Sequence, residues 1–303
     1  MTTEPMWLYA IAPTQFAGSG VVDLAAMIDN AAEMAHHGID HFLLTGAYGE
    51  FQSLGDDERV AIVEAMAGCG HARSLLVGAS HPSTEATVSL ARRLLDAGAN
   101  LIMVAPPMLA ELTADDVRRH FDHLAGHVEA PLVVYNNPVF GMELTAAELG
   151  GLAALGPYVA VKQGATRISD AIASVHEVRA ASGGAVKVLA ASDAAASVTL
   201  AAGFDGLTST NSWVFPNAFM SMVSAAAEGR PGHMREIRMA LDPYFRAVRK
   251  LGQPRAVKAA MRIRGYAGSS SVRLPYTGVS RAEAEQLALA VEECDQKLAD
   301  INV

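Results

Sequence analysis

The sequence is poor in cysteine and has no long apolar run. Only Cys69 and Cys294 occur among its 303 residues, far apart and outside any CxxC pattern, which argues against a disulfide framework and against a zinc site. No apolar stretch reaches the roughly 18 to 20 uncharged residues that span a bilayer, so we expect a soluble protein with no membrane partner. The N-terminus lacks a basic region followed by an apolar stretch and a cleavage site, and we therefore expect a cytoplasmic location.

Positive charge is also scarce. Lys and Arg number 23 against 32 Asp and Glu, which gives a formal net charge of -9. Nucleic-acid binding depends on the neutralisation of phosphates by basic side chains, so we expect no nucleic-acid partner. Charged residues make up 18% of the chain and hydrophobic residues 51%, which is enough apolar material for a large core.

Apolar, strand-like runs alternate with segments of helical character along most of the chain, a pattern typical of a parallel sheet with crossover helices. Eight strands are predicted, at residues 6–13, 41–47, 74–80, 100–107, 131–138, 158–165, 186–192 and 206–210. No GxGxxG turn follows the first strand, and eight βα units in about 210 residues favour a closed barrel over an open doubly wound sheet. The sequence therefore predicts an α/β protein with a (β/α)8 TIM barrel over residues 1–228.

After the eighth unit the chain reads as helices joined by Gly, Pro and Ser. Three helices are predicted, at 231–250, 253–265 and 280–301, and the last begins at Ser280 with Glu283 in capping-box spacing. No linker separates this part from the barrel. We therefore expect residues 229–303 to form a C-terminal three-helix extension and not an independent domain.

Lys162 is the most informative candidate for chemistry, because TIM barrels react substrates at the C-terminal ends of their strands. It ends the sixth predicted strand, in YVAVKQGA, where three of the four preceding residues are Val or Ala. An apolar interior disfavours the charged amine, lowers its pKa and leaves free amine that forms a Schiff base with a ketone or aldehyde. The alternative is that Lys162 extends to solvent or pairs with a carboxylate at the barrel mouth.

Tyr135 holds the comparable place on the fifth predicted strand. Its phenol is predicted to reach the same pocket and to act as the acid/base of imine formation and carbon–carbon cleavage; the alternative is a core tyrosine bonded to backbone. The stretch GAYGE, residues 46–50, places two glycines around a turn whose backbone N–H groups suit a carboxylate. The alternative is a turn in which glycine is only sterically required. Glu50 is expected to tie down its own loop.

Together these motifs resemble the dihydrodipicolinate synthase / N-acetylneuraminate lyase family of class I, pyruvate-handling aldolases. They follow the family order: APTQF, then GAYGE for Gly-x-x-Gly-Glu, VYNNP for Tyr-Asn-x-Pro, and VAVKQGA around the imine lysine. The resemblance extends over the barrel and the extension. It implies that Lys162 is the Schiff-base lysine, that Tyr135 is the acid/base, that the backbone of Ala47 and Tyr48 holds the 2-oxo acid carboxylate, and that Thr208 lines the same pocket.

The sequence departs from the synthases that make the lysine precursor. Ala47 and Tyr48 stand where these have hydroxyl residues between the two glycines, and APPMLAEL lacks the relay tyrosine expected after the fourth strand. Val139 and Phe140 stand where the synthases carry an arginine for the second carboxylate, which exchanges an anion clamp for an apolar surface. We therefore expect 4-hydroxy-tetrahydrodipicolinate synthase activity to be the less favoured alternative.

Another branch resembles the chain more closely. The hydratase-aldolases of the trans-o-hydroxybenzylidenepyruvate type share PPML, NPVF and an aromatic residue between the glycines, although their usual threonine is Ala47 here. This resemblance implies that Asn137 positions a hydroxyl or water, and that Trp213 stacks on an aromatic or unsaturated tail, with Phe140 also at the substrate. The alternatives are that Asn137 caps a turn before Pro138 and that Trp213 is wall packing.

The expected function is that of a Schiff-base lyase or aldolase acting on pyruvate or a pyruvate-containing 2-oxo acid, with an apolar or aromatic aldehyde favoured as acceptor. A dehydratase or aldolase of 2-keto-3-deoxy sugar acids is the nearest alternative, and a non-catalytic 2-oxo-acid sensor is the alternative of another class. The expected partners are small molecules, a 2-oxo acid and an aldehyde. The resemblance implies no metal or organic cofactor, and it implies a homotetramer built as a dimer of dimers.

Overall fold

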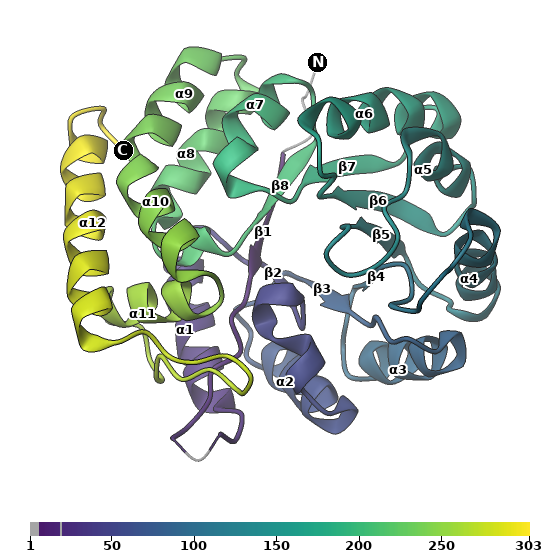
Figure 1. The fold of residues 1–303 in the computed structure, drawn as a ribbon, viewed down its shortest axis with the longest axis horizontal. Helices are drawn as coiled ribbons and strands as arrows, with labels where there is room; N and C mark the ends of the chain where they lie inside the picture. Colours follow the sequence, from purple (N-terminus) through teal and green to yellow (C-terminus); the bar gives the residue numbers. More distant parts are fainter. Residues whose placement is uncertain (1–5, 19) are drawn as a thin grey trace.

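Eight parallel strands close into a barrel, in which each strand pairs with the next and β8 pairs with β1 (Figure 1). A computed structural model of the chain describes residues 6–18 and 20–303. The strands are β1 (Trp7–Ile11), β2 (His41–Leu44), β3 (Ser74–Gly78), β4 (Leu101–Val104), β5 (Leu132–Asn136), β6 (Tyr158–Gln163), β7 (Lys187–Ala190) and β8 (Gly206–Ser209). The predicted (β/α)8 barrel is confirmed.

Helices follow the strands and surround the barrel (Figure 1). They are α1 (Leu24–His36), α2 (Asp56–Gly68), α3 (Thr84–Asp96), α4 (Ala114–His127), α5 (Ala146–Ala153), α6 (Ile168–Ser182), α7 (Ala196–Ala201) and α8 (Pro216–Ala227). Single turns of 3-10 helix, η1 (Ala47–Gly49), η2 (Phe51–Ser53), η3 (Asp193–Ala195) and η4 (Asn211–Trp213), follow β2, β7 and β8. These short turns lie at the end of the barrel where the strands finish.

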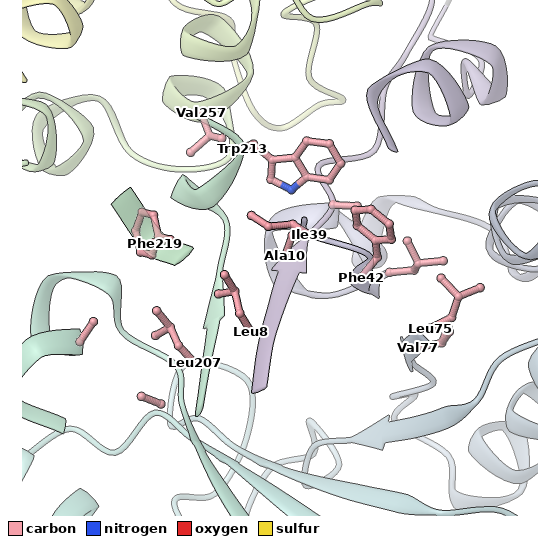
Figure 2. Close-up of a cluster of buried hydrophobic side chains, with 14 of the residues drawn as sticks. Leu8, Ala10, Ile39, Phe42, Leu75, Val77, Leu207, Trp213, Phe219 and Val257 are labelled. Atoms are coloured by element: carbon pink, nitrogen blue, oxygen red, sulfur yellow. The ribbon is translucent and has the colours of Figure 1, made fainter. Parts of the chain in front are cut away.

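Apolar side chains fill two layers, because alternate residues of a barrel strand point outward to the helices and inward to the barrel axis. Ala10 and Phe42 belong to the outer layer, which lies between strands and helices (Figure 2). Leu43 and Ala160 belong to the inner layer. Lys162 follows Ala160 by two positions on β6, and it therefore points into the barrel as well.

The barrel closes where β8 meets β1. Residues Trp7 to Ala10 pair in register with Gly206 to Ser209. A Cβ atom on Gly206 would overlap the carbonyl oxygen of Trp7. Glycine is required here because the two backbones approach too closely for a side chain.

Four helices follow the barrel where three are predicted: α9 (Pro231–Ala240), α10 (Asp242–Leu251), α11 (Arg255–Ile263) and α12 (Arg281–Ala299). The predicted helix over 231–250 is divided because Pro243, in the first turn of α10, has no N–H to continue the hydrogen-bond ladder of α9. The predicted capping box of Ser280 and Glu283 begins α12, which packs against α10 at the outer edge of the molecule (Figure 1). Across the described residues, no helix has the length and apolar character needed to cross a membrane.

Candidate active site

Lys162 lies near the C-terminal end of β6, inside the barrel. Its side chain is 2% exposed. Burial lowers the pKa of the amine to about 7, and the negative charge of Asp193 acts in the opposite direction. A large fraction of the amine is therefore neutral at neutral pH, the state in which a lysine is a nucleophile.

Tyr135 lies beside Lys162, with which it pairs in register across β5 and β6. The Lys162 Nζ atom lies 3.8 Å from the centroid of the Tyr135 ring. Burial raises the pKa of Tyr135 to about 12, while a hydrogen bond from Asn137 lowers it. The phenol consequently keeps its proton at neutral pH and is available as an acid next to the amine.

Asn137 connects the phenol to the loop after β5. Its Nδ2 donates to the Tyr135 hydroxyl at 2.6 Å, and its Oδ1 accepts from the Val139 N–H at 3.0 Å. The second bond caps the turn at Pro138, which is the alternative role expected for Asn137. Phe140 lies over the same region, with its ring centroid 6.1 Å from that of Tyr135 and 6.0 Å from that of Phe51.

Residues 46–50 form a tight turn at the C-terminal end of β2. Ala47 begins the 3-10 helix η1, and Glu50 ends it in the left-handed conformation, with φ 58° and ψ 35°. The N–H groups of Gly49 and Glu50 bond back to the carbonyls of Gly46 and Ala47. The N–H groups of Ala47 and Tyr48 come at the start of this helix, where a helix has no acceptor of its own for them. These are the groups predicted to hold a carboxylate.

A cavity of about 190 Å³ opens beside these residues. Tyr48 and Thr208 line it together with residues of η3, η4 and α10. Thr208 is buried, and its hydroxyl donates to the Ala190 carbonyl at 3.3 Å. A smaller hollow is lined by Ala47 and by the rings of Tyr135 and Phe140. Within the described part of the chain, no group of three or more His, Cys, Asp and Glu side chains is arranged to hold a metal ion.

Asp193 lines the cavity. It is not predicted as a site residue from the sequence, although it is a polar residue that follows the seventh strand. Burial raises its pKa to about 6, against hydrogen bonds from the side chain and backbone of Asn211 that lower it. The negative charge of Asp193 acts on Lys162, and the ring of Tyr135 lies 3.8 Å from the Lys162 amine. Tyr135 lines the smaller hollow and Asp193 lines the larger cavity.

The same wall presents polar atoms that lack a partner among the described residues. They are Asp193 Oδ1, Thr210 Oγ1, Asn211 Oδ1 and Gln253 Oε1, all buried and all from residues that line the cavity. Buried polar atoms in proteins are normally hydrogen-bonded. Gln253 belongs to the extension, and no local sequence pattern predicts that the extension reaches the mouth of the barrel.

Trp213 lies outside the barrel interior. Its ring stacks on Phe42 with centroids 5.7 Å apart, and its indole N–H donates to the Ile11 carbonyl at 2.8 Å. Figure 2 shows it in the outer layer near Ala10 and Phe42. The expectation that Trp213 stacks on a substrate tail is corrected: its apolar ring is buried between strands and helices and its one donor is already bound, so it is wall packing.

The sequence profile of the Dihydrodipicolinate synthetase family matches residues 7–294. The chain belongs to this family. The 4-hydroxy-tetrahydrodipicolinate synthase of Thermomicrobium roseum is 30% identical over 93% of this chain and 92% of that protein. The synthase of the same name from Haloarcula marismortui is 29% identical over 95% of this chain and 94% of that protein. As a member of the Dihydrodipicolinate synthetase family, the protein is a carbon–carbon lyase of the class I aldolase type.

Solved structures of the family agree with this fold. Dihydrodipicolinate synthase from Thermotoga maritima is 25% identical, with a TM-score of 0.90 over 97% of this chain and 99% of that chain. YagE, a prophage protein of the dihydrodipicolinic acid synthase family from E. coli K12, was solved in complex with pyruvate; it is 23% identical, with a TM-score of 0.90 over 96% of this chain and 98% of that chain. The family resemblance drawn from the four motifs is confirmed.

Proposed function

We propose that Lys162 forms a Schiff base with pyruvate, or with a 2-oxo acid that contains it, and that a carbon–carbon bond next to the imine is then broken or made. The observation that carries this proposal is the buried, readily deprotonated amine of Lys162 against the ring of Tyr135. The second buried lysine, Lys258, instead forms a direct ion pair with Glu50. The pyruvate complex of YagE supports the choice of substrate.

In the proposed reaction the neutral amine attacks the ketone carbon, and water leaves to give a cationic imine. The imine draws electrons from the bond that breaks in the retro-aldol direction, which leaves an enamine on Lys162. Tyr135, held by Asn137, donates and recovers the protons that these steps require. The N–H groups of Ala47 and Tyr48 hold the carboxylate, so the ketone is directed at the lysine.

Reduction with borohydride in the presence of pyruvate, followed by mass spectrometry of peptides, tests the first step. An adduct is expected on Lys162, and the peptide that carries Lys258 serves as the matched control because that amine is buried but paired. An unmodified Lys162 at saturating pyruvate contradicts the proposal. Turnover of any substrate that is lost in a folded Lys162→Ala variant excludes the non-catalytic sensor.

We propose that the acceptor side favours an apolar or aromatic group. Phe140 and Phe51 pack edge to face beside Tyr135, and Val139 is 78% exposed on the same loop. Neither Val139 nor Phe140 supplies a cation for a second carboxylate. The 4-hydroxy-tetrahydrodipicolinate synthase activity named for the curated relatives is therefore the less favoured alternative for this chain.

A 2-keto-3-deoxy sugar acid is the second candidate substrate, favoured by the unpartnered oxygens of Asp193, Asn211 and Gln253. A site whose buried acceptors are unpaired discriminates strongly for a substrate that brings hydroxyl donors. Release of pyruvate from a sugar-derived and an aryl-substituted 2-oxo acid compares the two candidates. Asp193→Ala is expected to impair the first reaction and Phe140→Ala the second. A product that retains all its carbons and has lost water instead indicates dehydration.

We further propose a homotetramer, a dimer of dimers, located in the cytoplasm. Met108 and Leu109 on the loop after β4 are exposed apolar side chains, which support contact with another subunit. The free state of Cys69 and Cys294 suits a reducing compartment. Light scattering after size exclusion is expected to give four times the chain mass of 31.8 kDa, and a monomer mass would contradict the assembly.

A further inference from the structure

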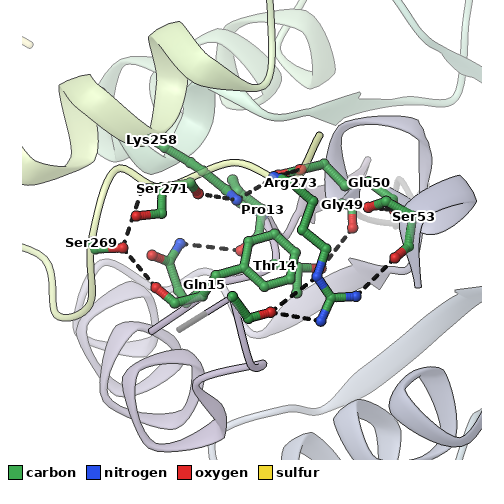
Figure 3. A network of polar contacts seen from close by, with 12 residues as sticks. Pro13, Thr14, Gln15, Gly49, Glu50, Ser53, Lys258, Ser269, Ser271 and Arg273 are labelled. Atoms are coloured by element: carbon green, nitrogen blue, oxygen red, sulfur yellow. Dashed lines mark hydrogen bonds and ion pairs between the residues drawn. The ribbon is translucent and has the colours of Figure 1, made fainter. Parts of the chain in front are cut away.

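Residues of the C-terminal extension bind Glu50, the residue that ends the turn carrying Ala47 and Tyr48 (Figure 3). We propose that Glu50, Lys258 and Arg273 are positioning residues, which hold the N–H groups of that turn in the arrangement that binds a carboxylate. The inference rests on the proposed function but concerns a separate property, the affinity for the carboxylate and not the reactivity of the amine.

The carboxylate of Glu50 is bound by residues of the extension. Lys258, on α11, donates from Nζ to Glu50 Oε1 at 2.5 Å, and the main-chain N–H of Arg273 donates to Oε2 at 2.9 Å. Lys258 also donates to the Ser271 carbonyl at 2.9 Å, so one segment holds both partners of Glu50. The Glu50 and Lys258 side chains are fully buried. Both oxygens of the carboxylate are thus fixed by residues 208 and 223 positions further along the chain.

Because the Glu50 side chain is held in place, the backbone of Glu50 also fixes the conformation of the turn. Its φ of 58° lies in the left-handed region, which costs a residue with a side chain about 1–2 kcal/mol. The N–H of Glu50 donates to the Ala47 carbonyl at 3.2 Å, and the Ser53 hydroxyl donates to the Glu50 carbonyl at 2.8 Å. A shift of Glu50 therefore moves Ala47 and Tyr48 with it.

Arg273 secures the neighbouring loops from the same side. Its guanidinium donates to the carbonyl of Ser53 at 2.8 Å, to the carbonyl of Gly20, and to both carboxylate oxygens of Glu58 at 2.5 and 2.7 Å. The Phe16 ring lies 4.6 Å from this guanidinium and 4.3 Å from the Lys258 amine. Glu58, on α2, thus binds the guanidinium of Arg273, whereas Glu50, at the end of the turn, binds the main-chain N–H of the same residue.

A buried ion pair is a weak source of stability, because the desolvation of both charges offsets their attraction. It is nevertheless specific, because any arrangement that separates Glu50 from Lys258 leaves a buried charge without a partner. The pair consequently restricts the turn to one geometry. Since a displacement of about 1 Å in a positioning group reduces rates by up to about a hundredfold, such a restriction bears directly on substrate binding.

The test compares Glu50→Gln with Glu58→Gln in the full chain. Half-saturation of borohydride trapping is measured with pyruvate and with methyl pyruvate, which has the same ketone without the carboxylate charge. Glu50→Gln is expected to raise the half-saturating pyruvate concentration by about tenfold to a hundredfold and to leave methyl pyruvate within about twofold. Glu58→Gln, the matched control, weakens only the contact with the Arg273 guanidinium and leaves the main-chain N–H of Arg273 on Glu50, so it is expected to change neither value.

Two outcomes overturn the inference while the proposed function stands. One is an unchanged half-saturation for pyruvate in folded Glu50→Gln, and the other is an equal shift for both ketones, which indicates a purely structural role. If the wild-type chain is not trapped at all, the proposed function and this inference fall together. If Glu50→Gln does not fold, Glu50→Asp keeps the charge and withdraws the carboxylate by one methylene; it is expected to show the same selective loss for pyruvate.

Discussion

Lys162 and Lys258 are both buried lysines, yet their surroundings prepare them for different roles. Burial lowers the pKa of Lys162 to about 7 and that of Lys258 to about 8. Lys258 is bonded directly to the Glu50 carboxylate, which holds its proton, whereas Asp193 acts on Lys162 only from a distance and the Tyr135 ring covers the amine. The contrast favours amine chemistry at Lys162 and a structural charge at Lys258.

Imine formation is expected to follow the deprotonation of Lys162. Because the pKa of Lys162 is about 7, trapping of pyruvate should become faster as the pH rises through about 7 and then level off. In Asp193→Asn the negative charge that raises this pKa is gone, so the midpoint should move to lower pH. Trapping rates with cyanoborohydride between about pH 5 and about pH 9 measure the midpoint. A variant midpoint at or above that of the wild type would disprove the assigned effect of Asp193.

The same lysine is expected to reduce the stability of the protein. Its pKa is 10.5 when unperturbed and about 7 when folded. The unfolded chain therefore binds more protons between these values, and stability rises with pH across that window. Lys162→Met should increase the free energy of unfolding by about 2–4 kcal/mol at about pH 6, and by less at about pH 10. Urea unfolding of both proteins at both pH values checks this; an equal gain at the two pH values argues against it.

At the scale of elements, the strands are predictable because each is a short apolar run that a parallel barrel buries on both faces. Helices of the extension are harder to predict. The run over 231–250 has helical character throughout, and only the missing N–H of Pro243 divides it into α9 and α10. Trp213 lies on a single 3-10 turn, where too few residues exist for a periodic pattern to indicate which side faces the substrate.

The candidate site is predictable where chemistry and strand ends coincide, as at Lys162 and Tyr135. Asp193 follows a strand too, but it has ordinary loop neighbours, and its raised pKa arises only from burial in the folded barrel. Glu50 and Lys258 are 208 positions apart in the sequence, so no local sequence pattern predicts their contact. Long-range contacts of this kind are decided by how the extension packs onto the barrel.

Closure of the barrel depends on Gly206. Because an added Cβ would overlap the Trp7 carbonyl, Gly206→Ala is expected to force β8 away from β1 and to lower the free energy of unfolding by about 1–3 kcal/mol. Gly151 on α5 is the matched control, because nothing lies within 4 Å of its added Cβ. Gly151→Ala should raise stability by up to about 1 kcal/mol, since alanine favours a helix. The denaturant midpoints of both variants are compared with that of the wild type. Equal shifts of the midpoint in Gly206→Ala and Gly151→Ala would contradict the steric explanation.

At the scale of the whole molecule, we propose that residues 1–228 and 229–303 unfold as one cooperative unit. The Glu50–Lys258 pair joins them on one side, and the Arg264 side chain bonds to the Val214 carbonyl at 2.9 Å on another. Trp7 reports on the barrel, whereas the ring of Trp213 lies 5.9 Å from that of Tyr266 in the extension, so the fluorescence is measured in a Trp213→Phe background. The buried thiol of Cys294 reports on α12.

Fluorescence and thiol reactivity in a Cys69→Ser background should therefore give coincident denaturant midpoints. The matched control is the far-UV circular dichroism of the same samples, which follows helices of both parts. A thiol that becomes reactive well before the fluorescence changes would show that the extension opens on its own.

The late position of Lys258 and Arg273 has a consequence for synthesis. A ribosome delivers the chain from its N-terminus, so Lys162, Tyr135 and the turn at 46–50 emerge before the residues that fasten the turn. On the positioning role proposed above, a nascent chain that stops short of residue 258 contains Lys162 and Tyr135 but lacks the residues that hold the carboxylate-binding turn in place. Unfinished chains would thus not bind substrate, because the carboxylate-binding turn takes its final geometry only after the last quarter of the polypeptide has been made.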